Sequence, residues 1–152
     1  MSALARLFRG QGAHEDSLRI VEGIDWRLAG MRPAGFRHSI YQLVFHLNFW
    51  MDVELKCIES TVKSHPDDWS LSWPDPEPKD DLAWRHELAL FRTSLDQLVT
   101  LADAQASTLA RIAHKGSDDT VETVLTALAV HNSYHLGQIV QLRQALGAWP
   151  PA

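Results

Sequence analysis

The chain has 152 residues, which is long enough to bury one hydrophobic core without disulfide bonds. Its residues are 45% hydrophobic and 22% charged, and no apolar run approaches the roughly 20 residues of a membrane helix, so we expect a soluble protein without a membrane partner. The formal net charge of -5, with no cluster of basic residues, argues against nucleic acid as a partner.

The beginning of the chain and its cysteine content indicate a compartment. Residues 1–12 lack a sustained apolar stretch and a small-residue cleavage site, so we expect a flexible tail rather than a secretory signal. The single cysteine, Cys57, cannot form an internal disulfide, which fits the reducing cytoplasm. No repeat or domain boundary is found, and residues 1–152 are predicted to form one domain.

Apolar residues recur at spacings of three and four, and no alternation of period two is found, so the fold class is predicted to be all-α. The first helix is predicted over about residues 14–31, before the helix-breaking Pro33. Ser39 is predicted to cap a second helix that ends near Val62.

The segment His65–Pro78 holds four of the seven prolines and is predicted to be a loop packed onto the helices by its two tryptophans. A third helix is predicted after Lys79. The irregular stretch 103–118 has an extra turn predicted over residues 109–113.

The fourth helix is predicted to be the longest. Asp119 and Glu122 have the spacing of a capping box, and the apolar pattern continues to Gly147, a span of roughly 28 residues. Four amphipathic helices must bury their apolar stripes against each other, which predicts a four-helix bundle.

Two histidines interrupt the apolar stripe of the fourth helix. His131 and His135 are four residues apart, so they lie on one helix face and can bind one metal ion. Burial without a partner would cost on the order of 1–3 kcal/mol per polar group, and metal ligation would satisfy both rings. The pair alone is equally compatible with histidines that bond to neighbouring side chains at the edge of the core.

His46 lies beside the apolar stripe of the second helix and can face the same interior. Three imidazoles on two helices would leave coordination positions open, as in catalytic sites, and suit Zn, Ni, Fe or Cu. Asn132 stands where a zinc protease of the H-E-x-x-H type has its glutamate, so peptide hydrolysis by that mechanism is unsupported.

The other histidines are weaker candidates. His65, His86 and His114 are expected to be solvated, because they lie in the loop, on a polar helix face and in the irregular stretch. His14 and His38 flank predicted helix starts and can approach one end of the bundle.

Four further residues are weighed for roles near the histidines. Cys57 follows His46 by eleven residues, about 16 Å along a helix, which is too far to share one ion. Tyr134 points away from the histidine face and is expected to serve packing. Gly137 is expected to allow another segment to approach closely. Gln138 is either a hydrogen-bond partner of a ligand or a solvated side chain, and is left out of the predicted site.

Two segments carry a resemblance to a known family. Arg32–Trp50, RPAGFRHSIYQLVFHLNFW, and His131–Ile139, HNSYHLGQI, combine an HSI…H helix with a terminal H-x-x-Y-H-x-G-Q-I helix in the same order as in the DinB/YfiT-like metalloprotein superfamily. The chain resembles this family over most of its length.

The resemblance implies an up-down-down-up bundle with a long crossover between helices two and three. It also implies a divalent metal, Zn, Ni or Fe, held by His46, His131 and His135. Similar proteins are bacterial and cytoplasmic, are often homodimers, and include low-molecular-weight-thiol S-transferases and mycothiol-dependent maleylpyruvate isomerases.

Two functions follow as hypotheses. The first is a metal-dependent thiol S-transferase, or a hydrolase or isomerase, that acts on a small electrophilic molecule, with the loop His65–Pro78 as part of the substrate pocket. The alternative is a non-catalytic dimeric bundle that binds a metal or another ligand.

Overall fold

The computed structural model describes residues 1–151, which form α-helices and one 3-10 helix. Within these residues the only extended pairing is an isolated bridge between Ile112 and Thr120, so the predicted all-α class is confirmed. The elements are α1 (Ala3–Phe8), α2 (Ser17–Ile20), α3 (Trp26–Gly30), α4 (Ile40–Ser60), η1 (Trp69–Ser72), α5 (Asp81–Ala102), α6 (Ala106–Leu109) and α7 (Val121–Ala145).

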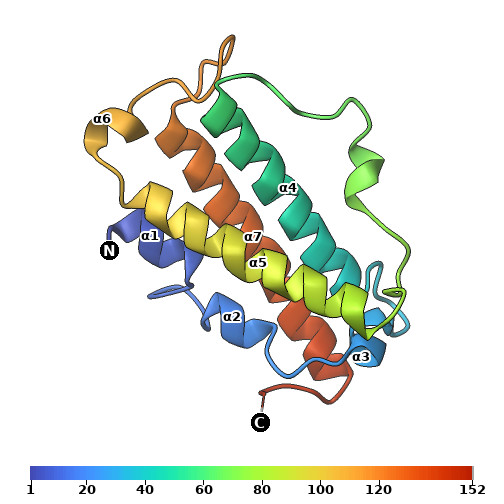
Figure 1. Cartoon of the computed structure of the whole chain (residues 1–152). Coiled ribbons are helices and arrows are strands. Elements are labelled where there is room, and N and C mark those ends of the chain that lie inside the picture. The colour runs from blue at the N-terminus through green and yellow to red at the C-terminus, as the bar shows by residue number, and fades with distance from the viewer. Residues whose placement is uncertain (152) are drawn as a thin grey trace.

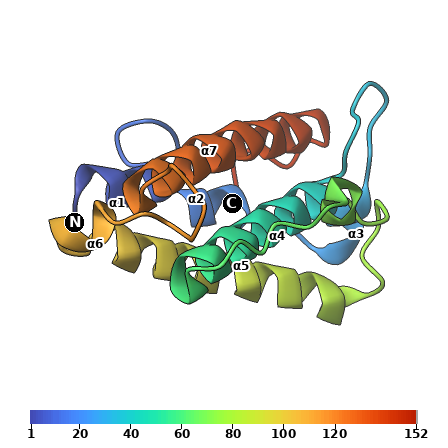
Figure 2. The same cartoon turned by 90° about the horizontal axis from the view of Figure 1, so that it is seen from above.

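Three long helices, α4, α5 and α7, form the frame of the molecule (Figures 1 and 2). Helices α4 and α5 run in the same direction, and residues 61–80 return along the outside to connect them (Figure 1). Helix α7 packs against α4 in the opposite direction, while α1 contacts both α5 and α7. Among residues 1–151, none of the helices combines the length and the hydropathy that a membrane span requires.

The second and third predicted helices are confirmed. Ser39 caps α4 in a capping box with Gln42, and α4 ends at Thr61, whose φ of 58° is left-handed. Helix α5 buries the predicted stripe against the core, including Trp84 and Phe91. Helix α4, which packs against α5, carries His46.

The predicted helix over residues 14–31 is wrong, because this segment forms the two short helices α2 and α3. The carboxylates of Asp16 and Asp25 each accept backbone N–H groups and start a separate helix. Between them Gly23 has a φ of 69°, which a right-handed helix does not allow.

Arg143 of α7 stabilises this break. Its guanidinium is buried, and Nη1 donates to the carbonyl oxygens of Ile20 and Glu22 at 2.7 and 2.9 Å. The carbonyl groups left free where α2 ends are therefore satisfied by a charged donor from another helix.

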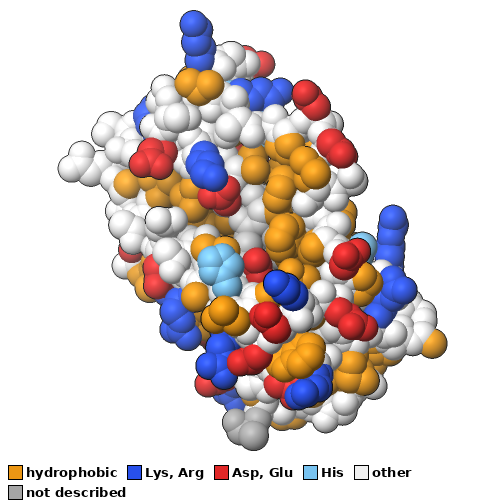
Figure 3. Space-filling view, turned by 45° about the vertical axis from the view of Figure 1, so that its right-hand side comes forward, with side chains coloured by type: hydrophobic (Ala, Val, Ile, Leu, Met, Phe, Trp, Pro, Cys, Tyr) orange, Lys and Arg blue, Asp and Glu red, His pale blue; other side chains and the backbone are white. Residues whose placement is uncertain are grey.

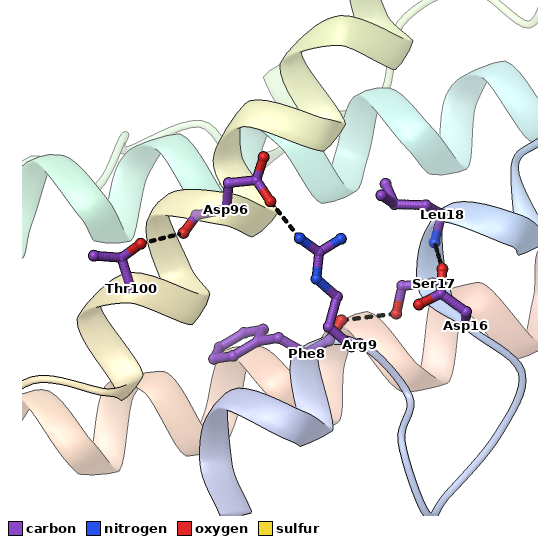
Figure 4. Close-up of polar contacts among 7 residues, drawn as sticks. All are labelled: Phe8, Arg9, Asp16, Ser17, Leu18, Asp96 and Thr100. Atoms are coloured by element: carbon purple, nitrogen blue, oxygen red, sulfur yellow. Dashed lines mark hydrogen bonds and ion pairs between the residues drawn. The ribbon is translucent and has the colours of Figure 1, made fainter. Parts of the chain in front are cut away.

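The expectation of a flexible tail over residues 1–12 is also wrong. Residues Ala3–Phe8 form α1, and Phe8 is 1% exposed within the hydrophobic core. Figure 4 shows how the segment is anchored: Arg9 pairs with Asp96 of α5, and the Ser17 hydroxyl donates to the carbonyl oxygen of Phe8 at 2.7 Å. Helices α1 to α3 thus take the place of the first long helix.

The last connection differs from the prediction in its boundaries. The extra turn lies at Ala106–Leu109 rather than at residues 109–113, since the N–H of Ala113 donates to the carbonyl oxygen of Asp119. The cap of α7 is Thr120 instead of Asp119, and its hydroxyl accepts the N–H of Thr123. Helix α7 has 25 residues, slightly fewer than predicted.

Candidate metal centre

The three histidines singled out from the sequence meet between α4 and α7. His46 and His135 are buried and His131 is partly buried. One ring nitrogen of each lies within 4.8 Å of the others, and the Nε2 atoms of His46 and His131 are 3.2 Å apart. These residues can therefore hold a metal ion.

A serine fixes the protonation of His46. The Ser72 hydroxyl donates its single hydrogen to the carbonyl oxygen of Trp69, at 2.8 Å. It must then accept a hydrogen from Nδ1 of His46, at 3.0 Å. The neutral ring consequently presents the Nε2 lone pair toward His131.

Gln138 fixes His135 in the same way. Its carbonyl Oε1 lies 2.7 Å from Nδ1 of His135, and an amide oxygen can only accept. Nδ1 therefore carries the proton and Nε2 carries the lone pair. The sequence is compatible with Gln138 either as a hydrogen-bond partner or as a solvated side chain. In the structure it is a hydrogen-bond partner of His135.

Trp73 stacks on one face of the His46 ring. The ring of Trp73 lies 3.8 Å from that of His46 at an interplanar angle of 11°, and 3.8 Å from that of His38 at 8°. His38 thus reaches the site through Trp73 rather than as a member of the triad. Sequence reasoning missed Ser72 and Trp73 as site residues, because loop residues carry no periodic signal.

The three rings are held in the neutral form. Burial, reinforced by the nearby His135 and His131, lowers the pKa of His46 to about 3. Burial and His135 lower the pKa of His131 to about 4, and burial lowers that of His135. Neutral imidazoles are the form that binds metals.

The donor set fits a transition metal. Hydrogen bonds present the Nε2 lone pairs of His46 and His135, and ligating histidines usually donate their second N–H in this manner. Two Nε2 atoms 3.2 Å apart can share at most one hydrogen, whereas one cation can accept both lone pairs. Imidazole nitrogen suits Zn, Ni and Fe.

The remaining histidines lie outside the triad. His14 bonds Ser133 of α7 at 3.0 Å, and His86 is exposed as expected. The expectation of a solvated side chain is wrong for His114, which is 9% exposed, and for His65, which bonds Glu54 at 2.6 Å. Both rings pack where the irregular stretch and the proline loop meet the end of α4.

Cys57 does not join the triad, as its spacing predicted. Its thiol is buried and bonds Ser64, and it lies near Glu54 and His65 instead. Two other expectations on α7 are wrong: Tyr134 is 64% exposed rather than packed, and a Cβ at Gly137 would meet no atom within 4 Å.

A cavity of about 730 Å³ opens beside the histidines. His46 and His131 line one end, and Trp50 of α4 and Trp69 of η1 line its wall. His65, Pro66 and Asp67 of the proline-rich loop also line it, as expected for a loop that forms part of a pocket. The triad is thus accessible to a small molecule.

Comparison with known families gives the same assignment as the motifs. The DinB superfamily matches residues 11–139, which include all three histidines. The chain belongs to the DinB superfamily. No curated protein and no solved structure matches this DinB-superfamily chain.

Proposed function

We propose that this DinB-superfamily protein binds one divalent transition metal, Zn, Ni or Fe, through Nε2 of His46, His131 and His135. We propose further that the site transfers a low-molecular-weight thiol to a small electrophile, or catalyses a related hydrolysis or isomerisation. The observation that carries this proposal is the pair of fixed tautomers, which leave a lone pair on each of two buried rings of the triad, beside a cavity that His46 and His131 line.

The wider features of the proposal follow the family. We propose an up-down-down-up bundle in which α1 to α3 together form the first arm and residues 61–80 form the crossover. We also propose a homodimer that works in the cytoplasm. The parallel course of α4 and α5 and the length of their connection support the topology (Figure 1).

The chemistry divides between the metal and the chain. A bound metal would supply Lewis-acid chemistry that makes a thiol or water nucleophilic near neutral pH. Ser72 and Gln138 orient the ligand rings, and Trp73 excludes water from one face of His46. The thiol comes from the co-substrate, because Cys57 is buried outside the triad.

The test is turnover across a panel of bacterial thiols and electrophiles with metal-loaded protein. We expect thiol consumption that a chelator abolishes and that the His135→Ala variant lacks. Full metal occupancy without metal-dependent turnover of any pair would contradict catalysis and favour the non-catalytic metal-binding bundle.

A further inference from the structure

The cavity has a second polar end, away from the histidine triad. His46, Trp50 and Glu54 follow each other at intervals of four along one face of α4, and all three line the cavity. The eight helical steps from His46 to Glu54 span about 12 Å of helix axis. A ligand that reached both ends would therefore be an elongated molecule.

Three side chains at the second end, Glu54, His65 and His114, offer hydrogen-bond acceptors. In its neutral form His65 donates Nε2–H to the Glu54 carboxylate at 2.6 Å, which leaves Nδ1 as a lone pair. Neutral His114 donates Nδ1–H to the carbonyl oxygen of Lys115 at 3.2 Å, which leaves Nε2 as a lone pair. Each of these bonds uses a partner that can only accept, so each ring keeps an acceptor free.

A backbone hydrogen bond holds the His114 turn in place. The N–H of Lys115 donates to the carbonyl oxygen of Thr61 at 2.8 Å, which ties the His114 turn to the end of α4. The ring centroids of His65 and His114 lie 6.0 Å apart, and the angle between the two ring planes is 79°. A preorganised group of acceptors loses little entropy on binding.

The charged residues that line the cavity also favour a positively charged ligand. Glu54, Asp67 and Asp119 are acidic, and Lys63 is the one lysine or arginine among the lining residues. Glu54 is the most enclosed of the three carboxylates, since Asp67 and Asp119 are exposed. The net charge of this end attracts a cation.

The middle of the cavity is apolar. Trp50 and Trp69 meet edge to face with ring centroids 5.6 Å apart, and Val124 and Leu128 of α7 line the same space. This section suits a short hydrocarbon or a flat apolar group.

We propose that the cavity end formed by Glu54, His65 and His114 binds a protonated amine of the substrate. This inference rests on the proposed function, because the other end of the ligand is taken to reach the triad. The substrate class is then an amine-bearing molecule with a short apolar spacer and a metal-binding group, such as a thiol.

The experiment uses cobalt-loaded protein at pH 8, where an alkylamine is protonated and imidazole is ordinarily neutral. The probes are alkanethiols of four to eight methylenes that end in an amine, a hydroxyl or a carboxylate, and binding is followed by the cobalt absorption. At the best length we expect the amine to bind about tenfold more tightly than the hydroxyl, or about 1.4 kcal/mol.

Glu54→Gln should abolish the tenfold preference, and His114→Phe should reduce it, while each keeps the affinity for the hydroxyl probe. Glu59→Gln is the matched control, because Glu59 is exposed on the same helix and outside the cavity lining. Equal binding of the amine and hydroxyl probes by the wild-type protein, or tightest binding of the carboxylate, would overturn the inference.

A metal-free arm separates this inference from the proposed function. In an NMR titration, hexylammonium should shift the indole N–H signals of Trp50 and Trp69 more than hexanol does. If it does so while no thiol changes the cobalt spectrum, the amine site stands and the thiol chemistry fails. If hexanol matches hexylammonium, the amine site is refuted whatever the thiols do.

Discussion

A single serine hydrogen decides which nitrogen of His46 carries the proton. Ser72 donates to Trp69 and so accepts from Nδ1 of His46. Gln138 performs the same role for His135 from the next turn of α7. His46 and His135 therefore each have a partner that orients the ring, which is the usual arrangement around metal-bound histidine, whereas Nδ1 of His131 is buried without a hydrogen-bond partner.

Ser72→Ala should weaken metal binding by about tenfold or more, because His46 loses the acceptor that fixes its tautomer. Competition with a chromophoric chelator measures the affinity. Ser70→Ala is the control, since Ser70 lies exposed in the same 3-10 helix and bonds Asp68. Equal affinity of the two variants would show that Ser72 does not orient the ligand.

The buried imidazoles should make the metal-free protein sensitive to acid. Their pKa values lie below the ordinary value of 6.5, so below pH 6.5 the unfolded chain binds protons that the folded chain does not. The free energy of unfolding should therefore fall as the pH drops from 6.5 toward 4. Urea unfolding with a chelator present measures this dependence, and His131→Gln should make it shallower. An unchanged slope in that variant would contradict the neutral state of the ring.

At the scale of elements, α1 is part of the hydrophobic core rather than a tail. Phe8→Ala should lower the free energy of unfolding by about 3 kcal/mol or more, because it removes a fully buried ring. Leu7→Ala, at a position 40% exposed, should cost much less. Chemical unfolding of both variants checks the difference, and similar small losses would mean that α1 is loosely attached.

The long helices could be predicted from the sequence, and the short ones could not. Helices α4, α5 and α7 each have an apolar pattern that repeats over many turns. The packing of α4 against α7 brings the three histidines together. In the segment before these helices the apolar spacing stays helical across Gly23 and therefore predicts one helix where the structure has two. The break depends on Asp16, Asp25 and a distant arginine, Arg143, which periodicity does not detect.

In the candidate site, the residues on long helices could be predicted from the sequence, and the residues on the loop could not. The spacing of His131 and His135 and the family motif predict the candidate ligands, since both patterns lie on regular helices. Ser72 and Trp73 reach the site only because residues 61–80 fold back along α4. Tertiary contacts of this kind leave no pattern in a single sequence.

At the scale of the whole molecule, apolar side chains are exposed among charged ones on the surface (Figure 3). On α7, Val130 and Tyr134 are 66% and 64% exposed and one turn apart. We expect this face to contribute to the proposed dimer, so Val130→Glu should give a monomer by light scattering. Leu82→Glu on α5, at a position also strongly exposed, should leave the dimer intact. A dimer that survives Val130→Glu would place the contact elsewhere.

The most direct test of the metal centre is the metal content of the purified protein, by elemental analysis after incubation with Zn, Ni or Fe and removal of free ions. We predict one equivalent per chain in the wild type and loss of tight binding in His46→Ala, His131→Ala and His135→Ala. His86→Ala, at an exposed position, should keep the full equivalent. A wild-type protein that retains no divalent metal, or triad variants that bind as well as the wild type, would contradict the metal centre.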